Sequence, residues 1–151
     1  MIIDSRAEFC DAIALNTGGA GTYLVGSQID TGAADNMGVD IEGAYLVITV
    51  DTAFTSSNST ATAQFVLASD DSASINTSTG SRHLVTKAFT VAEAAAGAVL
   101  YVGKLPYSGV EAYERYLGIL QITGTEAFTA GKINAFITAN PAAWAAKADA
   151  V

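Results

Sequence analysis

Short segments of alternating apolar and polar residues recur along the chain, and each is bounded by a polar or glycine-containing break. In residues 44–50, Leu46, Ile48 and Val50 fall on one face of an extended strand, because alternate side chains of a strand point to opposite faces. This rhythm predicts about seven or eight antiparallel strands in a sandwich or barrel. The expected strands span residues 22–29, 44–50, 62–68, 84–90, 99–105, 116–123 and 132–138.

Polar residues mark the connections between these strands. Residues 56–59 have a loop composition, and residues 69–80, nearly all Asp, Ser, Asn and Thr, are expected to project into solvent. Thr90 and Glu93 have the spacing of a capping box, and Gly97 follows as a stop signal. One or two helical turns are therefore predicted in this connection.

The two ends of the chain carry weaker helix signals. Residues 1–15 are expected to form an N-terminal arm, within which residues 6–15 fit a short helix. Asn140 followed by Pro141 is typical of a helix start, so residues 140–151 are predicted to form a C-terminal helical segment. The fold expected from the whole pattern is an all-β sandwich with short terminal helical segments.

Residues 110–117 fit two local structures. Glu111 and Arg115 are spaced for an ion pair on a helix, whereas the residues from Tyr116 onward are typical of a strand. We expect a loop or helical turn up to about Glu114 and a strand after it.

Length and composition indicate one globular domain, residues 1–151, because half of the residues are hydrophobic. A single cysteine, Cys10, excludes an intrachain disulfide and fits synthesis in a reducing cytoplasm. The first residues lack the pattern of a signal peptide, and no apolar run approaches the roughly 20 residues that cross a bilayer. We expect no membrane association.

The net charge of −8 is unevenly distributed. Residues 1–81 contain ten acidic residues and one basic residue, whereas residues 82–151 contain five acidic and six basic residues. Because a net-acidic protein repels phosphate backbones, nucleic acid is not expected as a partner. The acidic first half either keeps the protein soluble or steers it onto a basic partner.

The supply of catalytic and metal-binding side chains is small. His83 is the single histidine, and no nucleophile motif accompanies it, so no catalytic residue and no enzymatic activity are predicted. One histidine and one cysteine exclude the usual zinc ligand sets. Asp70 and Asp71 could contribute to an oxygen-ligand calcium site, but turn chemistry explains them better. We expect no cofactor and no metal.

Four tyrosines form a loose cluster around Pro106. Aromatic residues at such positions pack in a core, fill a protein interface or stack on sugars. All three alternatives remain open from the sequence. The tyrosines are Tyr101, Tyr107, Tyr113 and Tyr116.

Several stretches, in their order along the chain, carry a resemblance to a known family. They are residues 1–4, 8–12, 45–54, 63–71, 115–120, 124–125 and 128–137. Together they make the chain similar to the capsid cement (decoration) proteins of tailed bacteriophages, of the Bordetella-phage type. The resemblance covers nearly the whole chain and brings no catalytic residues with it.

The resemblance implies a jelly-roll fold, a homo-oligomer and a place on the outer capsid surface of the virion. There the protein would bridge neighbouring major capsid subunits after synthesis in the bacterial host. We expect a homodimer, with a homotrimer as the alternative, because two-fold symmetry is the commonest closed arrangement. The residues expected to contact the capsid or a second copy, unless they pack on their own sandwich, are Met1, Ile2, Ile3, Phe9 and Trp144.

Two other functions compete with this one. The first is a carbohydrate-binding or receptor-binding jelly-roll module, which would present exposed aromatic side chains in a groove. The second is a hydrolase, which would hold His83 against a serine and a carboxylate. The side chains that surround His83 therefore distinguish an enzyme from a binding protein.

Overall fold

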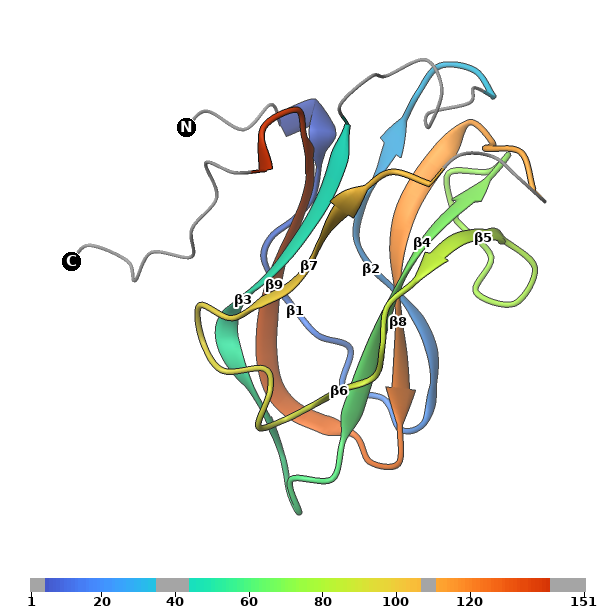
Figure 1. The fold of residues 1–151 in the computed structure, drawn as a ribbon. Coiled ribbons are helices and arrows are strands. Elements are labelled where there is room, and N and C mark those ends of the chain that lie inside the picture. Colours follow the sequence, from blue (N-terminus) through green and yellow to red (C-terminus); the bar gives the residue numbers. More distant parts are fainter. Residues whose placement is uncertain (1–4, 35–43, 107–110, 142–151) are drawn as a thin grey trace.

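The computed structural model describes residues 5–34, 44–106 and 111–141 (Figure 1). Residues 5–7 form a short 3₁₀ turn, η1 (Ser5–Ala7), and strands follow along the rest of the described chain. The strands are β1 (Glu8–Ala14), β2 (Gly21–Asp30), β3 (Tyr45–Ser56), β4 (Thr62–Asp70), β5 (Ser81–Val85), β6 (Phe89–Thr90), β7 (Val99–Lys104), β8 (Tyr116–Gly124) and β9 (Phe128–Thr138).

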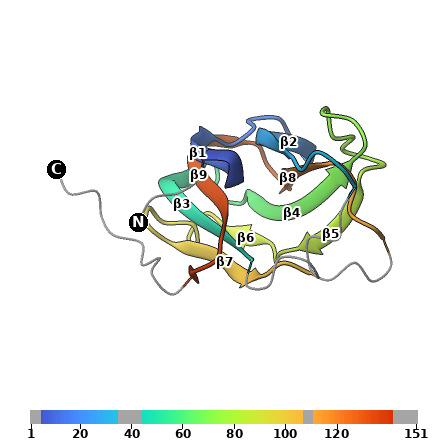
Figure 2. The same ribbon diagram turned by 90° about the horizontal axis from the view of Figure 1, so that it is seen from above.

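The strands form two antiparallel sheets that lie face to face (Figures 1 and 2). The first sheet has the order β1-β9-β3-β7, and the second has the order β2-β8-β4-β5, with β6 paired to β4. The first four strands alternate between the sheets, and strands far apart in sequence become neighbours. This is the wrapping of a jelly roll, so the predicted β-sandwich is confirmed.

The core lies between the two sheets and follows the predicted alternation. Leu46, Ile48 and Val50 of β3 point inward and are buried against the opposite sheet. Phe65 and Leu67 of β4 face them from the other side and have no exposed surface. Each fully buried aliphatic or aromatic side chain contributes roughly 1.5–3 kcal/mol relative to an exposed one.

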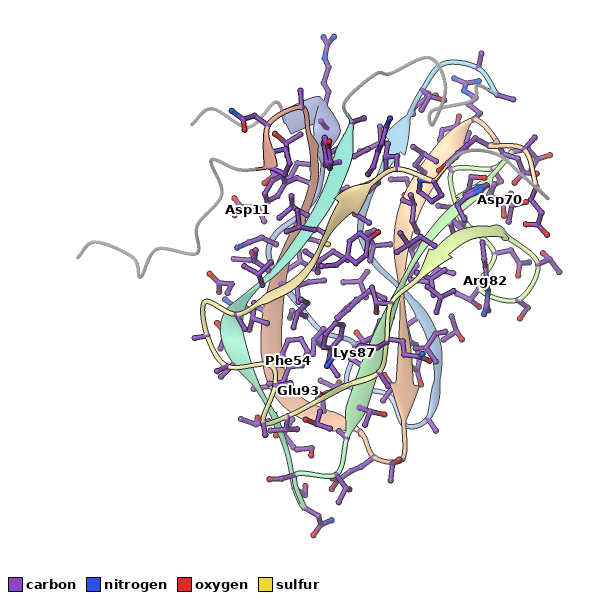
Figure 3. The ribbon with its side chains drawn as sticks, viewed as in Figure 1. Asp11, Phe54, Asp70, Arg82, Lys87 and Glu93 are labelled. Atoms are coloured by element: carbon purple, nitrogen blue, oxygen red, sulfur yellow. The ribbon has the colours of Figure 1, made fainter. Side chains whose placement is uncertain are left out.

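Aromatic packing extends the core toward one end of the sandwich (Figure 3). The Phe54 ring packs edge-on against Phe65 at a centroid distance of 6.4 Å and against Phe128 at 5.5 Å. Phe54 belongs to the part of β3 beyond the predicted end at residue 50. The longer strand thus adds an aromatic anchor that the sequence pattern did not reveal.

A second apolar cluster covers the outward face of the second sheet. Val66 and Leu120 lie there without exposed surface, and Ile75, which is 3% exposed, packs over them from the loop after β4. A Cβ atom at Gly118 would come within 2.5 Å of the Ile75 side chain, which shows how closely the loop approaches the sheet. The expectation that residues 69–80 project into solvent is therefore wrong at Ile75, whose apolar side chain packs the loop against the second sheet.

The N-terminal stretch differs from its prediction. Residues 6–15 do not form a helix, because η1 ends at Ala7 and the following residues pair with β9 as strand β1. An irregularity in this pairing, with Ala12 at a φ of 48°, interrupts the apolar–polar alternation. The interruption hid the strand from the sequence pattern. Part of the expected N-terminal arm is thus a full member of the first sheet.

The capping box between β6 and β7 is present in a turn rather than a helix. The Glu93 N–H donates to Thr90 Oγ1 at 3.4 Å, and the Thr90 N–H donates to Glu93 Oε2 at 2.9 Å. Lys87 also pairs with Glu93, and this contact is the largest cause that lowers the Glu93 pKa to about 2. Gly97 has a φ of 81°, in agreement with its expected role as a stop signal.

The connection before β8 contains no helical ion pair. Arg115 instead binds Asp30 of β2 through two contacts of 2.8 Å, and a Glu111 carboxylate oxygen accepts the Arg82 N–H at 3.1 Å. Strand β8 begins at Tyr116, as predicted. The long-range partners replaced the local pair that the spacing of Glu111 and Arg115 favoured.

The chain ends are described in part. Of the predicted C-terminal helical segment, residues 140–151, only Asn140 and Pro141 belong to the described residues, so this prediction is not decided. Within the described ranges, no helix is long and apolar enough to cross a membrane.

Candidate interaction surfaces

The structure places the single histidine beside a serine. His83 Nε2 lies 2.7 Å from Ser69 Oγ, and the Glu114 N–H donates to the same oxygen at 3.0 Å. The His83 ring stacks on Tyr113 with the centroids 3.8 Å apart. Sequence reasoning missed Ser69, because the contact depends on the register of β4 against β5 rather than on spacing along the chain.

A serine next to a histidine is the first part of a nucleophilic site, but a substrate must also reach the serine oxygen. Ser69 has no exposed surface. Its hydroxyl can donate to His83 while it accepts from the Glu114 backbone. The Glu111 carboxylate binds the Arg82 backbone. The hydrogen bonds of Ser69 therefore connect β4, β5 and the segment before β8, which supports a structural role for Ser69 and His83.

The position of His83 makes the free energy of unfolding depend on pH. Burial lowers the pKa of His83 below its ordinary value, against a smaller opposing effect of Glu111. The unfolded chain therefore takes up a proton first as the pH falls below about 6.5, and the folded state loses stability from there downward. A protonated Nε2 could no longer accept the Ser69 hydroxyl.

We predict that the native protein loses more of its free energy of unfolding between pH 7 and pH 5 than an H83F variant does. Phenylalanine keeps a ring against Tyr113 but has no proton to gain. Urea unfolding at both pH values measures the difference. Equal losses in the two proteins would show that His83 is not responsible for the pH dependence.

The acidic loop after β4 uses its carboxylates for its own turns. Asp70 accepts the Asn76 N–H at 2.8 Å and the Ser72 N–H at 3.0 Å, and these bonds lower the Asp70 pKa, the one from Asn76 most. Figure 3 shows Asp70 at the same end of the sandwich as Arg82. Within the described residues, no group of three or more His, Cys, Asp or Glu side chains could hold a metal ion.

The tyrosine cluster divides in the structure. Tyr113 is 2% exposed, and its hydroxyl donates to the Pro106 carbonyl at 2.7 Å. Tyr101 packs at the margin of the core, and Tyr107 lies outside the described residues. Tyr113 therefore serves packing, which was one of the three alternatives, and cannot offer its face to a sugar.

The expected contact residues are placed unevenly. Met1, Ile2, Ile3 and Trp144 lie outside the described residues. Phe9 is 1% exposed, because β1 turns this side chain into the core. The expectation that Phe9 reaches a neighbouring molecule is therefore corrected to a role in the core.

Exposed aliphatic side chains on edge strands are contact candidates that sequence reasoning missed. Val99 and Val102 are 45% and 44% exposed, and both belong to β7, the last strand of the first sheet. Val85 on β5 is 52% exposed, and Ile13 on β1 is 40% exposed. Single exposed aliphatic residues are common, whereas two on one short edge strand favour a contact surface.

Comparison with known proteins identifies a family match. A protein-family model described as Bbp16 matches residues 9–137, from the second residue of β1 to the penultimate residue of β9. The match therefore extends over both sheets of the sandwich. No curated protein matches the chain.

Proposed function

Because the chain belongs to the Bbp16 family, a family of Bordetella phage proteins, we propose that it is a structural virion protein that binds the outer capsid surface. In this role it bridges neighbouring major capsid subunits and stabilises the shell. The observation that carries the proposal is the family match over both sheets. The complete burial of Ser69, which keeps a substrate away from the hydroxyl beside His83, supports a binding role over a hydrolase.

The surface proposed for the shell contact is the exposed side of β7. Val99 and Val102 offer aliphatic area at the margin of the sandwich, and β7 pairs only with β3 among the described strands. A contact made mainly by two valine side chains would be weak for a single copy of the protein. Many copies on one shell, each touching more than one subunit, would add up to strong attachment.

Self-association is part of the proposal. A chain with a net charge of −8 repels a second copy, so two copies would meet through uncharged surface. We propose a homodimer as the assembled unit, with a homotrimer as the alternative, made in the host cytoplasm and carried on the virion. Sedimentation of the purified protein at several concentrations measures this state directly.

The proposal predicts the thermal behaviour of phage particles. Particles that lack the protein should release their DNA at a lower temperature than complete particles, and added native protein should restore the difference. A V102D variant should bind the shell at least tenfold more weakly, because it would bury a carboxylate at the contact. A dye that fluoresces on released DNA reports the temperature.

The matched control is V85D, which adds the same charge at a similarly exposed valine on the other sheet and should restore the particles fully. Equal release temperatures with and without the native protein would contradict the proposed function. Equal restoration by V102D and V85D would instead contradict only the placement of the contact on β7.

A further inference from the structure

A groove of about 470 Å³ lies between β1 and β2. Figure 2 shows these two strands side by side, where the first and second sheets meet. Five residues between positions 6 and 13 and the four residues 27–30 supply its lining. The two strands approach closely at one point, since a Cβ atom at Gly26 would lie 2.2 Å from the Phe9 carbonyl oxygen. The boundary between β1 and β2 is therefore closed at Gly26 and open beside it, where the groove lies.

Both strands along the groove are sheet edges. Strand β1 pairs with β9 and β2 pairs with β8, and each stands at the end of its sheet. The pairing of β2 shifts register between Val25 and Ile29, which leaves a bulge along residues 26–28. Edge strands carry backbone N–H and C=O groups that can pair with an added extended segment.

The lining combines apolar and acidic side chains. Ile13 is 40% exposed in the groove, and the partly buried Ile29 contributes further apolar surface. Glu8 and Asp11 add two carboxylates, for which no hydrogen bond or ion pair appears within the described part of the chain. Desolvation, and then the charge of Asp11, raise the pKa of Glu8, as expected for a carboxylate without a cationic partner.

The other two charges of the groove act differently. Asp30 is already neutralised by Arg115 of the segment before β8, which binds it at 2.8 Å. Arg6 also lines the groove and brings one positive charge. The carboxylates that remain at the groove are those of Glu8 and Asp11, on the same strand as the exposed Ile13.

From this geometry we propose that the groove binds an extended segment of a partner protein in which a lysine or arginine stands next to an aliphatic residue. The basic side chain pairs with Glu8 and Asp11, and the aliphatic side chain packs against Ile13. The segment adds to the edge of β1 or β2 by backbone hydrogen bonds. This contact lies at the opposite edge of the first sheet from β7 and does not depend on capsid binding.

The test uses two capped peptides of five residues, Lys-Val-Lys-Val-Lys and Glu-Val-Glu-Val-Glu, added to the full-length ¹⁵N-labelled protein. The lysine peptide should shift the amide signals of residues 8–13 and 27–30, and the glutamate peptide should leave them in place. An E8Q/D11N variant should bind the lysine peptide at least tenfold more weakly. An I13S variant should also bind it more weakly.

The control variant is D51N/D71N, which removes the same number of charges from exposed positions outside the groove and should bind like the native protein. Several results would overturn the proposal: no shifts at millimolar lysine peptide, equal shifts with both peptides, shifts outside the two segments, or equal binding by E8Q/D11N and the native protein. None of these measurements involves a capsid, so their failure is separate from a failure of shell binding.

Discussion

Replacement of Gly26 by alanine should lower the free energy of unfolding by about 3 kcal/mol or more. Gly26 has a φ of 77°, which costs an alanine about 1–2 kcal/mol. The new methyl group would also lie 2.2 Å from the Phe9 carbonyl oxygen and 2.4 Å from Cys10 Sγ, so β1 and β2 must move apart. Overpacking of this kind adds about 1–3 kcal/mol.

Gly32 provides the matched control, because its backbone conformation is similar but a new methyl group there would meet no other atom. Its φ is 82°, but no atom lies within 4 Å of the position that a Cβ would take. A G32A variant should therefore lose only the backbone cost of about 1–2 kcal/mol. Urea unfolding of the two variants measures both effects, and equal losses would mean that the close approach of β1 and β2 contributes nothing.

Replacement of Gln121 by glutamate should cost about 3–5 kcal/mol at pH 7, the loss typical of an uncompensated buried charge. Gln121 has no exposed surface and binds the backbone of Asn16 twice: Oε1 accepts the N–H at 2.8 Å and Nε2 donates to the carbonyl at 3.1 Å. Nε2 also donates to Thr123 Oγ1 at 2.7 Å. A carboxylate cannot make either donation and would bring a charge into the core.

The pH dependence of Q121E has a defined sign. Burial favours the protonated carboxyl, so its pKa in the folded state lies above the ordinary value of about 4.3 in the unfolded chain. Stability should be recovered as the pH falls from 7 toward that value and lost as it rises. A Q64E variant, half-buried on the outward face of β4, is the control and should lose less than about 1 kcal/mol. Similar losses at pH 5 and pH 7 would contradict this account.

The alternation of apolar and polar residues predicted the sandwich, because one buried face leaves a period of two in each strand. It failed where that period stops. Along β3, Asp51 and Thr52 are both exposed, so the alternation ends after Val50. The strand continues because Thr52 and Thr55 pair with β9. In β1, Phe9 and Cys10 are both buried although they are adjacent, so the apolar–polar pattern does not predict the strand.

Contacts between distant segments were beyond the reach of sequence patterns. Ser69 and His83 meet only because β4 and β5 pair in one particular register, with Ser69 opposite Ser81. The groove between β1 and β2 forms because the edge strands of two different sheets lie side by side. Neither strand alone indicates the groove. The shortage of catalytic side chains, in contrast, could be read directly from the composition.

The order of the strands has a consequence for synthesis in the cell. Strand β9 separates β1 from β3, and β8 separates β2 from β4, so one of the two inner strands of each sheet comes late in the chain. Neither sheet can assemble on the ribosome until these last strands emerge. A prematurely terminated chain would expose unpaired edges and be open to proteolysis, so only chains synthesised to residue 138 or beyond could complete both sheets.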